Sequence, residues 1–556
     1  MKNRNNGIRT TLSASLLVLL SGCGGGGDVV SSLLDNSENG ISFASADVAC
    51  NADPAQSCQA SLQAFPNAKV APGSFNWREE STSASGLAVV RDVNRIKQAD
   101  GSWLLHIDFK NALAPGVYRG KITLSFFDLV PLGSRFLPGS FNYTLTVTAA
   151  NGNLKPLARI TADWEGYNGN AAHTGFVPVT LDVANFSHRF SRASNDNTRF
   201  EQIAVADGKY LLISREVSTV PNAPVNPVLQ SYSETDNTLQ WRVAGSATAT
   251  FFNLAASGKQ VLVTSGETNG RLLTSFDSGN GSERFAHLDN YARLTSSRND
   301  FAPVVAGNQI CANNGTDGEL QCLNAGNGNL QWRASLRSLV DPVFQNTAPA
   351  ISNNLVLTNL NGKFSAFDRS TGSPQFSLAV PGPTSGSVQT FHELNQAVVA
   401  PESGSALLLD RRNLDGSPRD NTLTMVDLAT QKIRWQATGQ FTAHPVASPG
   451  VVYAGNHQTR AIEARELASG KLLWSWPLPL QNDDAFGDNL ILTNNLLLVS
   501  ARNNTWAIDL ATHQAVWSYH LSGKLALSAQ GVLYILGADP ANAIPARDWV
   551  VAINLK

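Results

Sequence analysis

A short motif recurs through the last two-thirds of the chain and limits the fold more than any other feature. In each copy an aromatic residue stands eight positions after a polar residue, as in FDRSTGSPQF and IDLATHQAVW. The pairs are Asp182 and Phe190, Ser233 and Trp241, Asp277 and Phe285, Asn324 and Trp332, Asp368 and Phe376, Asp427 and Trp435, Glu466 and Trp474, and Asp509 and Trp517. Most intervening residues are of turn-forming types such as Asp, Ser and Gly. The motif therefore predicts two strands joined by a turn.

The residues upstream of the motif supply two further strands, as in HPVASPGVVYAG and APAISNNLVLTN. Four antiparallel strands that recur every 39 to 59 residues are typical of a β-propeller blade. Because a blade cannot bury both of its faces alone, we expect the repeated aromatic residues to pack between adjacent blades. Each offers about 150–250 Å² for burial, and we interpret them as structural residues.

The two ends of the repeat region indicate how many blades there are. The chain ends in DWVVAINLK, where Asn554 matches the polar position without a following aromatic strand, whereas the strand around Phe190 has no blade before it. Pairing of these N- and C-terminal strands would complete one blade and remove free edges. We therefore predict an all-β chain with an eight-bladed propeller closed by this pairing. Seven blades remain an alternative if the longest interval, from Phe376 to Trp435, contains a degenerate unit.

The N-terminus has the features of an exported protein. Lys2, Arg4 and Arg9 precede an apolar stretch at residues 12–20, which is shorter than the roughly 20 residues of a membrane span and predicts a signal peptide over residues 1–22. The sequence LSGC at its end resembles the lipobox of bacterial lipoproteins, which implies acylation of Cys23 and an outer-membrane location. The alternative is an ordinary signal with an unrelated cysteine. Cys23 and the Gly- and Ser-rich residues up to 40 are expected to form a flexible tether.

The other four cysteines fall into two local pairs, Cys50 with Cys58 and Cys311 with Cys322. Exported chains fold in an oxidising compartment, so we predict two structural disulfides. Free buried thiols are the alternative.

Residues 41–154 carry alternating apolar and polar residues between Gly and Pro turns, as in GVYRGKITLSFF. This segment resembles the Ig-like β-sandwich modules of bacterial surface proteins. We interpret Trp77, Trp103 and Tyr118 as core aromatics, and a sugar-binding platform is the alternative. A lead-in at residues 155–180 then connects to the propeller at 181–556, and its His173 is interpreted as a hydrogen-bonded structural residue near a propeller opening.

The repeat units resemble those of the quinoprotein dehydrogenase-like, or PQQ-like, propeller superfamily. Its enzymes hold PQQ above a cation such as Ca²⁺, but the adjacent cysteines and long inserts typical of them are missing here. The order of lipobox, tether and propeller is similar to that of the propeller lipoproteins of the outer-membrane β-barrel assembly machinery, which are binding scaffolds. The inserted segment of about 110 residues distinguishes this chain from them.

These observations favour a lipid-anchored, non-catalytic binding or scaffold protein of the cell envelope, facing the periplasm or the cell surface. We expect no catalytic, cofactor-binding or metal-binding residues and no cofactor. The expected partners are the outer-membrane bilayer, through Cys23, and an envelope protein or polymer. Nucleic acid is excluded, because 41 Lys and Arg against 43 Asp and Glu give no basic excess. The alternatives are a PQQ-dependent oxidoreductase and a carbohydrate- or cell-wall-binding lipoprotein.

Overall fold

The structure is a computed structural model that describes most of the chain from residue 40 onward. The described residues are 40–52, 58–66, 75–82, 87–98, 101–110, 113, 115–126, 139–148, 150–195, 198–216, 227–245, 250–266, 271–288, 302–314, 319–336, 348–360, 363–380, 396–399, 401, 404–410, 421–479, 485–538 and 547–556. The predicted signal peptide, Cys23 and nearly all of the tether lie outside these residues. Within the described residues, no helix is long and apolar enough to cross a membrane. Their regular elements are all strands, apart from the 3-10 helix η1 (Val183–Asn185).

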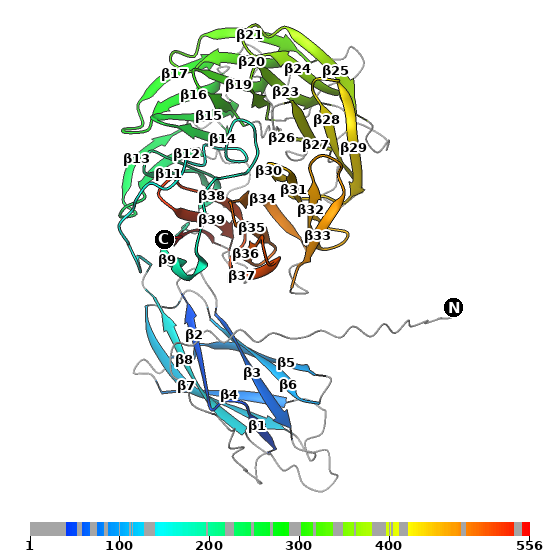
Figure 1. The fold of residues 1–556 in the computed structure, drawn as a ribbon. Coiled ribbons are helices and arrows are strands. Elements are labelled where there is room, and N and C mark those ends of the chain that lie inside the picture. Colours follow the sequence, from blue (N-terminus) through cyan, green and yellow to red (C-terminus); the bar gives the residue numbers. More distant parts are fainter. Residues whose placement is uncertain are drawn as a thin grey trace, which may run out of the picture.

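The N-terminal strands form two four-stranded sheets, which lie below the propeller in Figure 1. One sheet has the order β1 (Ile41–Phe43), β3 (Gln59–Pro66), β6 (Trp103–Phe109) and β5 (Val90–Lys97), and the other β2 (Asp47–Ala52), β8 (Gly139–Val147), β7 (Gly116–Phe126) and β4 (Phe75–Ser81). β2 and β8 pair in parallel. Both sheets contribute to one core that contains Trp103 and Tyr118, and the partly buried Trp77 packs against it. The predicted disulfide between Cys50 and Cys58 is present.

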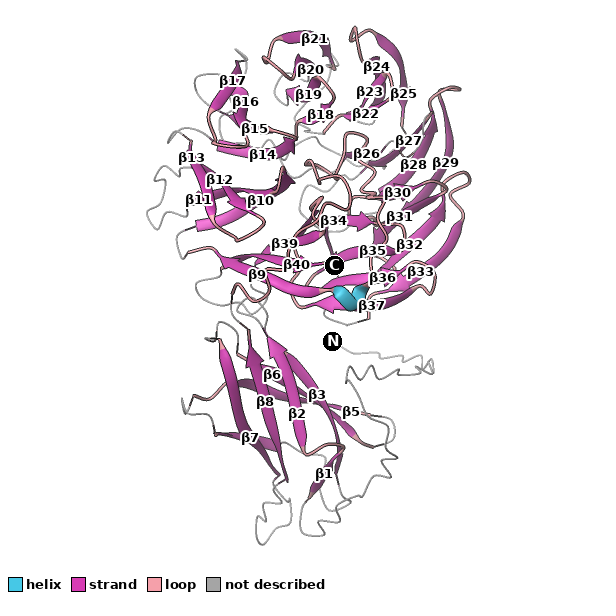
Figure 2. Cartoon of the chain, turned by 60° about the vertical axis from the view of Figure 1, so that its left-hand side comes forward, coloured by secondary structure: helices cyan, strands magenta, loops and turns pink. Residues whose placement is uncertain are grey.

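Eight further four-stranded sheets are arranged around a common centre (Figures 1 and 2), and we call them blades 1–8. Blade 1 has β10 (Thr198–Ala206), β11 (Lys209–Glu216), β12 (Pro227–Ser233) and β13 (Leu239–Ala244); blade 2 has β14 (Thr250–Ser257), β15 (Gln260–Gly266), β16 (Arg271–Asp277) and β17 (Glu283–Leu288). Blade 3 has β18 (Val304–Ala306), β19 (Gln309–Asn314), β20 (Glu319–Asn324) and β21 (Leu330–Ser335); blade 4 has β22 (Ala350–Ser352), β23 (Leu355–Leu360), β24 (Lys363–Asp368) and β25 (Pro374–Ala379).

Blade 5 has β26 (Gln396–Val399), β27 (Ser405–Asp410), β28 (Asn421–Asp427) and β29 (Lys432–Gly439); blade 6 has β30 (Val446–Ser448), β31 (Val451–Asn456), β32 (Ala461–Glu466) and β33 (Leu472–Pro477). Blade 7 has β34 (Phe486–Leu492), β35 (Leu496–Ala501), β36 (Thr505–Asp509) and β37 (Gln514–Tyr519). Blade 8 combines β38 (Lys524–Leu527), β39 (Val532–Ala538) and β40 (Asp548–Asn554) with β9 (Ser187–Ala193). In blade 8, Phe190 of β9 pairs with Ala552 of β40, so the strand around Phe190 pairs with the C-terminal strand.

Neighbouring blades share hydrophobic cores. Leu211 of blade 1 and Val261 of blade 2 belong to one cluster, and one larger cluster joins Leu498 of blade 7, Leu533 of blade 8 and Leu212 of blade 1. Each blade therefore depends on its neighbours for the burial of its faces, as expected for blades that cannot form a core alone.

The repeated aromatic residues lie on the outermost strand of each blade. Phe190, Trp241, Trp332 and Trp435 are buried, whereas the other four are partly buried. Three of the tryptophans donate an indole N–H hydrogen bond to a main-chain carbonyl in the motif turn of the next blade, each at 2.8 Å: Trp241 to Ser278, Trp332 to Arg369 and Trp435 to Leu467. The motif thus joins each of these blades to the next.

The motif turn is built to receive this ring. The residue four positions after the polar residue has a positive φ in blades 1–7 (Asn237, Gly281, Gly328, Gly372, Gln431, Gly470 and His513). The four glycines lie directly against the aromatic ring of the preceding blade, and a Cβ on Gly372 would lie 2.5 Å from Trp332 Cε3. In blade 7, His513 stacks on Trp474 instead, with ring centroids 4.3 Å apart.

The acidic residue that begins the turn is also held in place by its neighbours. Hydrogen bonds from Thr430 and Arg434 lower the pKa of Asp427 to about 2. The Ser370 hydroxyl and the Thr371 main-chain N–H lower the pKa of the Asp368 carboxyl, and the Thr512 main-chain N–H lowers that of Asp509. Each acidic side chain thus replaces a main-chain acceptor in the turn.

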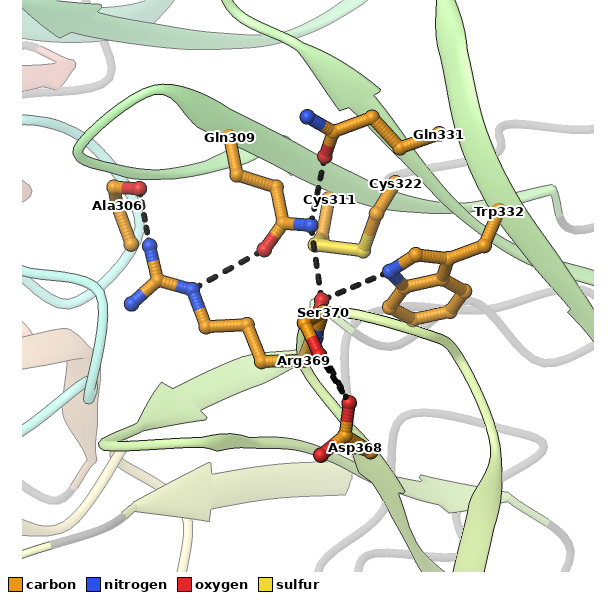
Figure 3. Close-up of a disulfide and its surroundings, with 9 residues drawn as sticks. All are labelled: Ala306, Gln309, Cys311, Cys322, Gln331, Trp332, Asp368, Arg369 and Ser370. Atoms are coloured by element: carbon orange, nitrogen blue, oxygen red, sulfur yellow. Dashed lines mark hydrogen bonds between the residues drawn. A yellow bond between two sulfur atoms is a disulfide. The ribbon is translucent and has the colours of Figure 1, made fainter.

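The second predicted disulfide, between Cys311 and Cys322, joins opposite positions of β19 and β20. Figure 3 shows it beside the contact between blades 3 and 4. There Arg369 of blade 4 donates from Nε to Gln309 Oε1 of blade 3 (3.1 Å), and Gln309 Nε2 donates to the carbonyl of Arg369 (3.0 Å). The same carbonyl accepts the indole N–H of Trp332, so several polar contacts meet at one turn.

The turn glycine of blade 4 offers a test of this packing. We expect Gly372→Ala to destabilise the propeller by about 2–5 kcal/mol, because a left-handed alanine costs roughly 1–2 kcal/mol and overpacking typically adds 1–3 kcal/mol. Gly208→Ala is the matched control, since its φ of +70° resembles the +72° of Gly372 but no heavy atom lies within 4 Å of its added Cβ. Thermal unfolding of both variants checks this, and equal losses would contradict the packing contribution.

Candidate functional site

The lead-in lies across one end of the propeller, and we call this end the sealed end. Main-chain hydrogen bonds tie it to the last residues of inner strands: Trp164 N donates to Leu527 O of β38 (3.1 Å), and Val177 N donates to Leu492 O of β34 (2.8 Å). Further main-chain bonds join it to Val205, Ala256, Ile351 and Ala447, which belong to blades 1, 2, 4 and 6. The lead-in therefore lies at a propeller opening, as expected from the sequence, and braces six blades.

His173 lies inside this seal. It is fully buried, and its carbonyl accepts a hydrogen bond from the Asn168 side chain. Its ring packs edge-on against Tyr167, with centroids 4.8 Å apart, and Tyr167 also packs edge-on against His444 of the segment before β30. The Tyr167 hydroxyl is 3.2 Å from His444 Nδ1. These contacts fix the lead-in against blade 6.

The opposite ends of the inner strands carry a cavity of about 290 Å³ between blades 7, 8 and 1. Phe486 and Lys524 open β34 and β38, and Phe200 lies near the start of β10. The lead-in contacts the far ends of these same three strands, at Leu492, Leu527 and Val205. The cavity, which we call the three-blade pocket, therefore faces away from the sealed end.

Close contact between main chains forms one wall of the three-blade pocket. Gly523 precedes β38 and Gly537 lies near the end of β39. A Cβ on Gly523 would overlap the carbonyl oxygen of Leu536, and one on Gly537 would overlap that of Ser522. Only glycine permits this approach, so the wall is built from main chain and its position is closely defined.

The pocket brings together aromatic and charged residues. Phe200 and Phe486 line it with the cations Arg502 and Lys524 and the carboxylates Glu201 and Asp548. The ammonium of Lys524 donates to the carbonyl of Glu201 (3.0 Å).

Each carboxylate of the pocket already has a partner on blade 1. Glu201 is paired with Arg215, with Nη2 and Oε1 2.6 Å apart. Asp548 Oδ2 accepts the main-chain N–H of Phe200 (2.8 Å), and burial nevertheless raises the pKa of this carboxyl.

Two further ionisable side chains, Arg189 and Glu234, are buried at the seam between blades 8 and 1. Arg189 of β9 is fully buried, and its Nε donates to the carbonyl of Glu234 in the blade 1 turn (3.0 Å). Phe190 has no indole N–H, and Arg189 makes the bond to the turn that tryptophan makes at three other seams. The Glu234 carboxyl accepts a hydrogen bond from the Tyr534 hydroxyl (3.0 Å). Burial raises the pKa of Glu234 to about 7, and the Tyr534 hydrogen bond and nearby Arg189 oppose that rise.

The quinoprotein resemblance implies PQQ with a bound cation. Calcium requires six to eight oxygen ligands, several of them carboxylates. Within the described residues, no group of three or more His, Cys, Asp or Glu side chains could hold a metal ion. The two carboxylates of the three-blade pocket are occupied by Arg215 and by the N–H of Phe200. The described residues do not fit a Ca²⁺–PQQ pair, and we derive no step through one.

The repeats and sheets define a protein built on a PQQ-like β-propeller. A family model described as "Outer membrane protein assembly factor BamB" matches residues 225–437 and 346–519, together more than half of the chain. The chain belongs to this family.

Individual relatives are distant. A tetrathionate hydrolase of Acidithiobacillus ferrooxidans is 26% identical over 117 residues, covering 20% of this chain and 22% of that protein. Matched solved structures include BamB from Moraxella catarrhalis, with 15% identity, a TM-score of 0.46 and coverage of 66% of this chain and 99% of that one. A europium-containing methanol dehydrogenase has 11% identity, a TM-score of 0.49 and coverage of 70% and 98%. The chain thus spans about a fifth of the curated relative that it matches.

The sequence did not predict the charged residues of the three-blade pocket or the buried Arg189 and Glu234 at the seam between blades 8 and 1. Arg502, Lys524 and Asp548 stand outside the aromatic motif, and no local pattern links them to residue 200. One signal was available at the seam: Glu234 follows the motif's polar residue where Leu or another small or apolar residue stands in most repeats, and an acid there is unusual.

Glu234 predicts a pH dependence of stability. Its pKa rises from 4.5 to about 7 on folding. Its favourable contribution is therefore complete below pH 4.5 and is lost as the pH rises through 7. A shift of this size corresponds to about 3 kcal/mol. We expect Glu234→Gln to gain stability relative to the parent between pH 5 and 8, as measured by unfolding at each pH. The exposed Glu80→Gln is the control, and parallel pH profiles for parent and Glu234→Gln would contradict the assignment.

Proposed function

We propose that this protein is a lipid-anchored, non-catalytic binding protein of the bacterial cell envelope, with its propeller as a platform for an envelope protein or polymer. Family membership supports the envelope association, since the family is described by outer membrane protein assembly. The observation that carries the binding role is the three-blade pocket, which opens at the end of the propeller opposite the lead-in.

The construction of the pocket suits binding. Its walls come from three blades that share one hydrophobic cluster, so they are positioned before a partner arrives. Preorganised walls lower the entropy cost of association. Aromatic residues and arginine, here Phe200, Phe486 and Arg502, are enriched in protein interfaces. The pocket is therefore a suitable anchor point for a partner on this face.

The anchor in this proposal is the acylated Cys23, with residues 24–40 as the tether and the two-sheet sandwich as a spacer or second contact. Stable anchoring requires more than one acyl chain. An intact-mass measurement of the mature chain checks the modification. The sandwich supports carbohydrate binding poorly, because Trp103 and Tyr118 are only 4% and 8% exposed.

A photocrosslinking amino acid at Ala538 tests the binding role. We expect a discrete product with an envelope component when this variant is expressed in its native host, because Ala538 is exposed and lines the pocket. The control position is Lys471, which is exposed beside the outer strand of blade 6. Absence of a product at Ala538, or the same products from both positions, would rule out the pocket as the contact site.

An enzyme is the second candidate, and the local match to tetrathionate hydrolase favours it. Titration with PQQ and Ca²⁺, followed by dye-linked alcohol oxidation and by tetrathionate hydrolysis assays, separates the two functions. We expect no saturable PQQ binding and no turnover. Turnover that rises with protein concentration in either assay would replace the binding function with a catalytic one.

A further inference from the structure

We propose that the three-blade pocket binds a carboxylate-bearing peptide segment, with an Asp or Glu side chain against Arg502 and Lys524 and an adjacent apolar side chain against Phe200 and Phe486. This inference rests on the proposed binding function and specifies the chemistry of the partner at that site.

The charge around the pocket favours an anion. Arg502 and Lys524 line it, and Arg215 and Arg199 of blade 1 stand beside its two carboxylates, Glu201 and Asp548. Among the described residues at the pocket, four cations therefore lie near two carboxylates, and one of these carboxylates is already ion-paired with Arg215, whereas the whole chain has a net charge of −2. The burial that raises the pKa of Asp548 reduces the negative charge further as the pH falls.

The two cations of the pocket come from different blades. Arg502 follows the end of β35 in blade 7, and Lys524 begins β38 in blade 8. Both line the same cavity, so a carboxylate between them can accept charge-assisted hydrogen bonds from two blades. The carboxylate of Glu201 is ion-paired with Arg215, which also lies on blade 1.

The remaining walls favour a peptide over a bare anion. Phe200, Phe486 and Leu536 give the cavity an apolar side that phosphate or sulfate would leave unused. The volume of about 290 Å³ is at the lower limit of ligand pockets, about 300–1,000 Å³. It accommodates a short side-chain segment and excludes a folded domain, so the partner would insert an exposed loop or an extended terminus.

Fluorescence anisotropy with the full chain tests the inference. The probe is a capped, rhodamine-labelled peptide of alternating Phe and Glu, and its matched control carries Gln in place of Glu. We expect the Gln peptide to bind at least about tenfold more weakly, as expected for loss of a charge-assisted hydrogen bond. Binding of the Glu peptide should weaken as salt is added, because exposed charges are screened.

Variants of the chain then locate the site. We expect Arg502→Gln and Lys524→Gln each to weaken binding of the Glu peptide about tenfold. Arg333→Gln is the matched control, since Arg333 lies on β21 of blade 3 with its side chain 51% exposed. Because Lys524 also bonds to the main chain of Glu201, thermal unfolding is measured for every variant, and Arg502→Gln tests the site without removing that bond.

Each remaining outcome overturns the inference. Equal binding of the Glu and Gln peptides, or no effect of Arg502→Gln, excludes recognition of a carboxylate here. Displacement of the peptide by equimolar inorganic phosphate indicates a general anion site, and displacement by anionic lipid vesicles indicates a lipid headgroup. If crosslinking at Ala538 persists while the peptide fails to bind, this inference fails and the proposed function stands. If neither the crosslink nor peptide binding is observed, both the inference and the proposed binding function are refuted.

Discussion

The contact between an outer-strand aromatic residue and the motif turn of the next blade is the interaction on which the propeller depends. At three seams an indole N–H donates to a turn carbonyl at the same distance of 2.8 Å. At four seams a glycine in the turn leaves room for the ring. The aromatic residue and the turn glycine of one repeat therefore serve two different seams, one on each side of the blade. This explains why both recur in the motif.

The seam between blades 8 and 1 keeps this geometry with different chemistry. The strand β9 comes from the N-terminal side of the propeller and carries Phe190, which cannot donate a hydrogen bond to the turn. Arg189 donates to the Glu234 carbonyl instead. A guanidinium and a carboxyl are therefore buried at this seam, and burial of such groups is costly unless they are hydrogen-bonded. The raised pKa of Glu234 reflects that cost.

The lead-in gives the ring of blades two different ends. Its hydrogen bonds reach the inner strands of six blades, at or near their last residues, and the cavity lies at the beginning of three of these strands. The blades that form the cavity are those that share the largest cluster around the seam. The closure of the propeller and the shape of the three-blade pocket thus depend on the same packing between blades 7, 8 and 1.

The sequence by itself determined the repeats, the all-β class, both cysteine pairs and the pairing of the strand around Phe190 with the C-terminal strands. The spacing of residues within each repeat reveals these features. Because each blade must bury both of its faces against neighbours, the repeats also predict a closed ring of blades. Lipidation of Cys23 and the identity of a partner stay predictions. Only the tertiary structure decided where Glu201, Arg502 and Lys524 meet, because each lies at the end of a different blade, up to about 320 residues apart in the sequence. It also decided that Arg189 replaces the missing indole, since a hydrogen bond across a seam depends on strands that the chain order does not place together.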